Sequence, residues 1–189
     1  MVYGVRRLPG KRSSTSTTSS LERILEVDDS FLPPKLELDG SYERLIDLLY
    51  SVFERDFIIY RTIFRGLPVV VDDRKIDSNM EEGFWHVVTR GKDDRLLDFK
   101  RAKRLPWLKP LIESGPDPDI LRWEEDELDR RRGQMVRKYF IWYENGDYLV
   151  ILKEKPGRYF LATAFHVTGS REHGYYMKRY QAKKKGTGY

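Results

Sequence analysis

The sequence lacks cysteine altogether, and this absence excludes several kinds of protein. Without thiols the chain can form no disulfide, no thiolate metal site and no cysteine nucleophile. It has no apolar run near the roughly 18 residues that a membrane span needs. A Ser/Thr-rich run follows the first basic residues, where a signal peptide would need an apolar segment. These absences favour a soluble, cytoplasmic protein with no membrane partner.

Histidine is scarce as well, because the chain has only three: His86, His166 and His173. No two of them have the i, i+4 spacing of a zinc hydrolase helix. The acidic pairs at 72–73 and 93–94 are typical of turns rather than of magnesium sites. The sequence also has no phosphate-binding glycine loop, nucleophile elbow or dinucleotide-binding fingerprint. We therefore expect neither a metal nor a cofactor.

Charged residues are abundant, at 34% of the chain against about 25% in an average globular domain. The net charge is +5, which favours polyanionic partners such as nucleic acid but also fits a merely soluble surface. The hydrophobic fraction of 40% is enough for one buried core. We expect a single domain over 21–182, between a flexible Ser/Thr-rich tail at 1–20 and a basic tail at 183–189.

The first half of the chain predicts a mixture of helices and strands. Apolar residues at helical spacing predict an amphipathic helix from about Tyr42 to Phe57, with Ser41 as its N-cap. The β-branched run at 68–71 and the segment Phe84–Thr89 predict two strands. A second helix is predicted over 98–113, and the mixed charge run at 124–133 is typical of a solvated face or loop.

The clearest local pattern lies around Asn145-Gly146. Aromatic and β-branched segments at 138–144 and 147–154 flank this dipeptide, which predicts a type I′ hairpin with a two-residue loop. Such a loop places Tyr143 opposite Tyr148.

A second turn returns the chain as a third strand over 158–167, so the strands form an antiparallel meander. Both faces of this meander are apolar. We expect the N-terminal helix on one face and either a cover or a working surface on the other. A short helix is predicted in the basic stretch at 178–185. The fold class predicted from these elements is α+β.

One chemistry needs few parts and no metal, namely RNA cleavage by attack of the ribose 2′-OH on its own phosphate. It requires a base, an acid for the leaving oxygen, and cations or donors on the phosphate. His86 is a candidate acid or base, and the alternative is a structural imidazole bonded to a backbone carbonyl. The basic cluster at 100–104 is a candidate phosphate site or a solvated face. Thr163 and Arg158 are candidate donors or ordinary strand residues.

Five segments carry a resemblance to a known group of proteins: Phe84–Thr89, Arg101–Leu108, Tyr139–Trp142, Tyr148–Leu152 and Tyr159–Phe165. Together they resemble the phage- and mobile-element-associated nuclease domains grouped with barnase, EndoU, the tRNase colicins and RelE, over about 80–182. The resemblance implies N-terminal helices packed on an antiparallel four-stranded sheet. It implies a metal-independent endoribonuclease, a toxin or phage effector, that leaves 2′,3′-cyclic phosphates. The implied partners are RNA, with tRNA among the candidates, and a cognate antitoxin or immunity protein.

Carried onto this sequence, the resemblance implies catalytic roles for His86, Arg101 and Thr163. Substrate binding is assigned to five further residues: Arg90, Lys103, Arg104, Tyr148 and Arg158. No role is assigned to His166, where the resembled pattern has an aromatic residue. Two alternatives remain open. A non-catalytic nucleic-acid-binding module would need the arginines and lysines but not His86, and a protein-interaction or inhibitor domain would use the aromatic strand edge.

Overall fold

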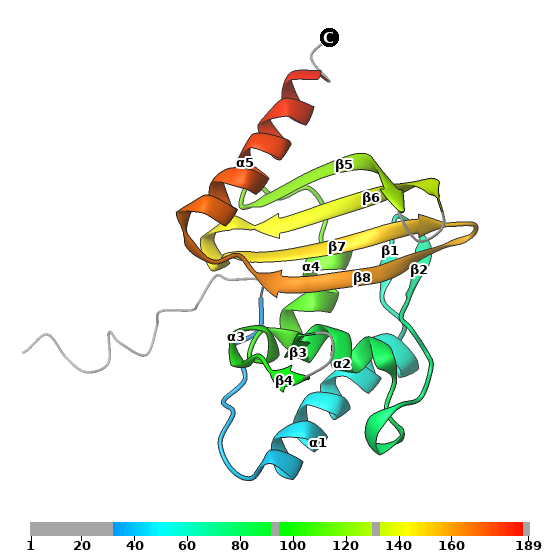
Figure 1. Cartoon of the computed structure of the whole chain (residues 1–189), viewed down its shortest axis with the longest axis vertical. Helices are drawn as coiled ribbons and strands as arrows, with labels where there is room; N and C mark the ends of the chain where they lie inside the picture. Colours follow the sequence, from blue (N-terminus) through cyan, green and yellow to red (C-terminus); the bar gives the residue numbers. More distant parts are fainter. Residues whose placement is uncertain (1–31, 92–94, 130–132, 187–189) are drawn as a thin grey trace, which may run out of the picture. The chain divides into compact units, whose positions relative to one another are not determined.

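The computed structural model describes residues 32–91, 95–129 and 133–186, and it has the predicted α+β fold, with N-terminal helices, a six-stranded sheet and a C-terminal helix (Figure 1). The helices are α1 (Tyr42–Phe53), α2 (Glu82–Val88), α3 (Phe99–Ala102), α4 (Leu108–Glu113) and α5 (Gly169–Gly186). The strands are β1 (Ile63–Phe64), β2 (Leu67–Val70), β3 (Thr89–Arg90), β4 (Leu96–Leu97), β5 (Ile120–Asp129), β6 (Gln134–Tyr143), β7 (Tyr148–Lys155) and β8 (Arg158–His166). No described helix is long and apolar enough to cross a membrane.

The main sheet has the strand order β1-β2-β8-β7-β6-β5, and β3 pairs with β4 in a separate hairpin. Strands β6 to β8 form the predicted antiparallel meander, and β5 adds a fourth antiparallel strand to it. Strand β2 joins it in parallel with β8, where Val69 pairs with Tyr159 and Val70 with Phe160. The β1–β2 hairpin therefore extends the sheet beyond the meander.

Strand β5 corrects the prediction that the charged run at 124–133 is a solvated face or loop. Its charges pair with those of β6, as where Arg137 Nε donates to Asp126 at 3.0 Å and Lys138 binds Glu127. Its one tryptophan, Trp123, stacks on Phe140 with ring centroids 4.7 Å apart. Opposite charges across a strand pair stabilise it, and charged residues are common on edge strands.

The β6–β7 hairpin confirms the predicted register but not the predicted turn. Tyr143 pairs with Tyr148 as expected. However, residues 144–146 form a 3₁₀ turn, and positive φ occurs at Asp147 (50°) rather than in the type I′ pattern at Asn145 and Gly146. Gly146 is needed for close approach instead, because a Cβ there would lie 2.5 Å from the Tyr143 ring.

Both faces of the sheet are covered, as their apolar character requires. One face packs on the N-terminal helices through a single large cluster of buried side chains that includes Leu49, Phe53, Phe84, Leu108, Ile141 and Val150. The other face packs on α5 through a smaller cluster formed by Trp123, Phe140, Trp142, Leu149, Ile151 and Val167, with Tyr176, Met177 and Tyr180 against it. The helices that contact this first face are α2, α3 and α4, whereas the N-terminal helix α1, predicted to lie on the sheet, packs on α2 farther from the strands; α5 covers the second face (Figure 1).

The segment Phe84–Thr89, which we predicted as a strand, is mostly the helix α2. A run of six residues that are mostly apolar has no clear alternation, so it does not distinguish a buried strand from a buried helix. Phe84 packs against Phe53 of α1 at 5.6 Å between ring centroids, which anchors α2 against the first helix. Gly83 allows the approach, since a Cβ there would meet the Val71 side chain at 2.7 Å.

Other predicted boundaries also shift. Ser41 caps α1 by accepting from the Arg44 amide at 3.4 Å, as predicted, and a π-helical turn extends α1 to Ile59. The helix predicted over 98–113 is α3 and α4, separated by a 3₁₀ turn at Leu105–Trp107. Residues 183–186, predicted as a tail, continue α5. The predicted tail at 1–20 lies outside the described residues.

Candidate active site

A pocket of about 280 Å³ lies beside β8, where α2, the β3–β4 hairpin and α3 meet the sheet. Four of the eight predicted site residues line it, and each comes from a different element: His86, Arg90, Arg101 and Thr163. Four more residues complete the lining: Glu82, Thr89, Gly91 and Arg95. Residues separated by up to 77 positions in the sequence (86 to 163) therefore meet at one place.

His86 faces the pocket because of how α2 packs. The other large side chains of this helix, Phe84, Trp85, Val87 and Val88, are buried, whereas His86 is exposed. Its charge reaches Asp72 as well. A hydrogen bond from Arg74 lowers the pKa of Asp72, and a smaller attraction to His86 acts in the same direction. The imidazole thus lies at the surface within the field of a carboxylate, rather than in the core.

Arg101 is held in place by neutral and charged groups together. Asp98 caps α3 by accepting from the Arg101 amide at 3.2 Å, and the same carboxylate lies 3.6 Å from the Arg101 guanidinium. Arg101 Nη1 donates to the Thr89 carbonyl at 3.2 Å, and its guanidinium lies 5.7 Å from the Phe165 ring centroid. A guanidinium has five N–H donors, so this anchoring leaves donors for a ligand.

Glu82 is a site residue that sequence reasoning missed. It precedes His86 by one helical turn, so the two side chains share one face of α2 and line the same pocket. Arg95 Nη2 donates to the Glu82 carboxylate at 2.7 Å. The strand that we predicted began at Phe84 and left Glu82 out, and in an extended strand residues four apart would be separated by roughly 13 Å. Because this segment was not predicted to be a helix, the four-residue spacing of Glu82 and His86 was not recognised as a pair on one helix face.

Thr163 lies at an irregularity of the sheet. The register between β7 and β8 shifts between Ile151 and Leu152, so that Thr163 pairs with Ile151, Leu161 pairs with Leu152, and Ala162 is skipped. Strand β2 pairs with β8 only at Tyr159 and Phe160, so it does not reach Thr163. Bulges redirect neighbouring side chains and are common next to active sites. The bulge and the short β2 leave this stretch of β8 free to border a pocket.

Four predicted substrate-binding residues do not line this pocket. Tyr148 is fully buried against Trp107, so its ring is not available for stacking on a base. Arg104 lies over the Trp107 ring and donates to the Lys100 carbonyl at 2.9 Å. Lys103, the residue that follows α3, is exposed and does not line the pocket. Arg158 begins β8, five residues or roughly 16 Å before Thr163.

The charge of the pocket suits an anion. Three guanidinium groups face one carboxylate, and a hydroxyl and an imidazole supply further hydrogen bonds. Within the described residues no cluster of three or more histidines and carboxylates could hold a metal ion. Arginine binds phosphate through its fork of N–H donors, so a phosphate is the ligand that this lining fits best.

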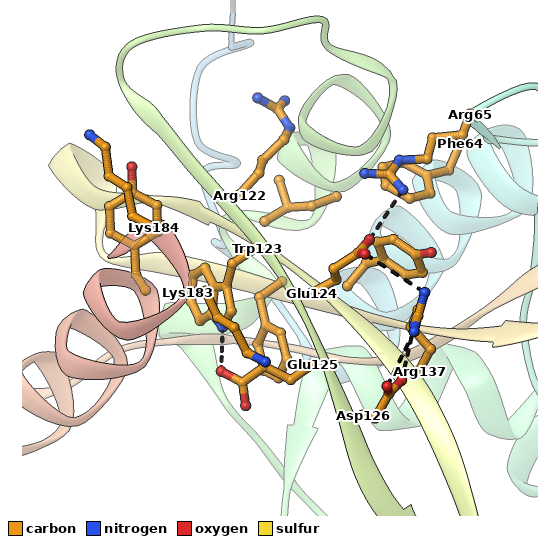
Figure 2. Close-up of a pocket in the computed structure, with 14 residues that line it drawn as sticks. Phe64, Arg65, Arg122, Trp123, Glu124, Glu125, Asp126, Arg137, Lys183 and Lys184 are labelled. Atoms are coloured by element: carbon orange, nitrogen blue, oxygen red, sulfur yellow. Dashed lines mark hydrogen bonds and ion pairs between the residues drawn. The ribbon is translucent and has the colours of Figure 1, made fainter. Parts of the chain in front are cut away.

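A larger cavity of about 700 Å³ is lined by residues of β5, β6 and α5 together with Phe64 and Arg65 at the end of β1 (Figure 2). It also contains several cations. Figure 2 shows that two of its arginines point at carboxylates of β5, and the distances are 3.3 Å from Arg65 to Glu124 and 3.0 Å from Arg137 to Asp126. Arg65 and Arg137 are thus paired with carboxylates, whereas Arg122 of the same cavity donates to the carbonyl and hydroxyl of Ser114.

Comparisons of the chain with protein-family profiles, with characterised proteins and with solved structures found no match.

Proposed function

We propose that the chain is a metal-independent endoribonuclease that cleaves RNA through attack of a ribose 2′-OH on the adjacent phosphate. The observation that carries the proposal is the meeting of His86, Arg90, Arg101 and Thr163 in one small cationic pocket. The α+β arrangement, with helices against a sheet that contains an antiparallel meander, is of the kind that the resemblance implies, although the sheet has six strands rather than four. The roles of a toxin or phage effector, and an antitoxin partner, belong to the same proposal.

The pocket offers a group for each part of the reaction. The Glu82 carboxylate accepts the proton of the 2′-OH as its oxygen forms a bond to phosphorus. His86, in its protonated form, donates a proton to the departing 5′-oxygen as the P–O5′ bond breaks. The products are a 2′,3′-cyclic phosphate and a free 5′-hydroxyl. Arg101 and Arg90 stabilise the charge that develops on the phosphate, and the Thr163 hydroxyl donates to one of its oxygens. Arg95 orients Glu82.

The test is cleavage of total tRNA and of a synthetic RNA by the purified full chain in EDTA. We expect the His86→Ala variant to lose about two to four orders of magnitude in rate, as is usual for a general acid or base. His173→Ala is the matched control, because His173 lies on α5 and pairs with Glu144 at 3.2 Å, outside the pocket. Wild-type products should carry 2′,3′-cyclic ends.

Two other outcomes would contradict the proposal. RNA that is bound in a salt-dependent manner but never cut, with His86→Ala indistinguishable from wild type, would favour the nucleic-acid-binding module. Neither cleavage nor binding at low salt would favour the protein-interaction domain. Circular dichroism of each variant separates loss of function from loss of fold.

A further inference from the structure

A second hollow, of about 440 Å³, adjoins the candidate active site. Arg90 and Arg101 line both cavities, so the two arginines form the boundary between them. On its far side the hollow is bordered by Phe99, Phe165 and His166. A ligand held by its phosphate in the first pocket would therefore extend directly into the second. The volume of this hollow falls within the roughly 300–1,000 Å³ of small-molecule sites.

The aromatic side chain of Phe99 lines this hollow and is exposed to it. Phe99 is the first residue of α3 and is 50% exposed, although most phenylalanine side chains of the described chain are buried. Its place is fixed, because the preceding Asp98 caps the helix by accepting from the Lys100 amide at 3.0 Å. An exposed ring on a rigid element, inside a hollow, is a surface on which a flat ligand can stack.

The hollow also contains hydrogen-bond donors. The Lys100 and Arg101 side chains line it, and His166 Nδ1 is buried with no hydrogen-bond partner among the described residues. Burial, with smaller contributions from Arg104 and Lys100, lowers the pKa of His166, so the ring is neutral near pH 7. A neutral imidazole keeps one N–H, so this side chain can supply one donor to a ligand.

We propose that this hollow binds an unpaired nucleobase next to the phosphate held in the candidate active site, so that the substrate is single-stranded RNA. The inference rests on the proposed ribonuclease function. The base stacks on Phe99, and its carbonyl oxygens accept from Lys100 and His166. A base inside a duplex is already stacked on both faces and cannot enter, whereas a base in a loop or single strand can.

The experiment uses a short oligonucleotide with one ribose, at the cleavable position, and deoxyribose elsewhere. Versions with an abasic site on either side of the cleavable phosphate are compared with the intact one. We expect one abasic version to be cut roughly 5- to 150-fold more slowly, which is the range of base stacking on an aromatic side chain. Phe99→Ala should lower cleavage of the intact substrate by a similar factor and leave that abasic substrate unaffected.

Two further variants make the result specific. Phe99→Trp keeps a stacking surface and should retain the preference for a base. Tyr60→Ala is the matched control, because Tyr60 is an exposed aromatic residue (68%) that lines neither cavity. The same substrate annealed to a complementary strand should be cut far more slowly than the single strand.

The outcomes separate this inference from the proposed function. Equal cleavage of intact, abasic and duplex substrates, unchanged in Phe99→Ala, would overturn the base site and leave the ribonuclease proposal standing. Binding of the all-deoxy analogue is measured in parallel by fluorescence anisotropy. If wild type cuts no RNA but binds this analogue in a way that Phe99→Ala weakens, the ribonuclease proposal fails and the base site stands.

Discussion

The two flanks of the sheet hold similar side chains in different electrostatic states. Beside β8, Arg101 is anchored mainly by the Thr89 carbonyl and a carboxylate 3.6 Å away, and the pocket keeps an excess of positive charge. Along β5, Arg137 and Arg179 each meet two carboxylates. An arginine that already meets two carboxylates gains less from a phosphate than one that meets a single, more distant carboxylate. The number of arginines alone therefore does not locate an anion site, whereas their partners do.

The strongest challenge to this comparison is to remove one arginine from each flank. We expect Arg101→Ala to lower kcat/KM for RNA cleavage by about two to three orders of magnitude, because it removes the main stabiliser of phosphate charge. Arg137→Ala on β6, which is exposed and ion-paired, should leave cleavage within about twofold of wild type, as is usual for surface pairs. Equal losses in the two variants would show that the flanks do not differ as described.

Removing an arginine from the β5 flank should lower the stability of the fold and leave cleavage unchanged. Arg179 of α5 is only 18% exposed, donates to Glu125 at 2.5 Å and lies 4.7 Å from the Phe140 ring centroid. We expect Arg179→Ala to reduce the free energy of unfolding by about 2–4 kcal/mol, since it leaves partly buried carboxylates without their partner. Urea denaturation measures the loss. Cleavage per folded molecule should stay at the wild-type value, and a selective loss of cleavage would place α5 in the active site instead.

Lowering the pH should reduce the free energy of unfolding that the β5 flank contributes, because Glu127 becomes protonated. Burial raises the pKa of Glu127, but hydrogen bonds from Lys138 and Arg179 outweigh it, so the net pKa lies below the usual value of a glutamate. Because the folded pKa is depressed, the stabilisation is present above the unfolded pKa and is lost as pH falls through the folded pKa. Glu127→Gln should cost about 1 kcal/mol at pH 7 and progressively less in acid. A pH-independent difference in urea midpoint would contradict this assignment.

The sequence was most informative where a pattern is compatible with only one local structure. The position of Asn145-Gly146 between two strand-forming segments determined the pairing of Tyr143 with Tyr148, because the loop of a hairpin sets its register. It did not determine the turn, which depends on how closely Gly146 approaches Trp107, a residue nearly 40 positions away. The charged strand β5 was missed although its partner β6 follows it directly, because charged residues on an edge strand resemble those of a solvated loop; only Arg179 of α5 is a distant partner, 54 residues from Glu125.

The residues of the candidate site were likewise predicted only in part. His86, Arg101 and Thr163 were selected as residue types in a resembling order, and the structure places them around one pocket. Glu82 was missed because α2 was predicted as a strand. Tyr148 was included because an aromatic strand residue has the same appearance in sequence whether it faces solvent or the core. The chemical type of a candidate residue can thus be taken from the sequence, whereas its exposure depends on which other elements pack against its side chain.

The parallel pairing of β2 with β8 determines when the pocket can form. Val69 and Tyr159 are 90 residues apart (159 − 69), and the β8 wall of the pocket lies just beyond this pairing. Contacts between distant residues form slowly, since the intervening chain must first be ordered. At about 5–20 residues per second on a ribosome, β8 emerges many seconds after α2. A nascent chain would therefore carry its histidine and arginines without an assembled pocket until β8 has emerged and paired.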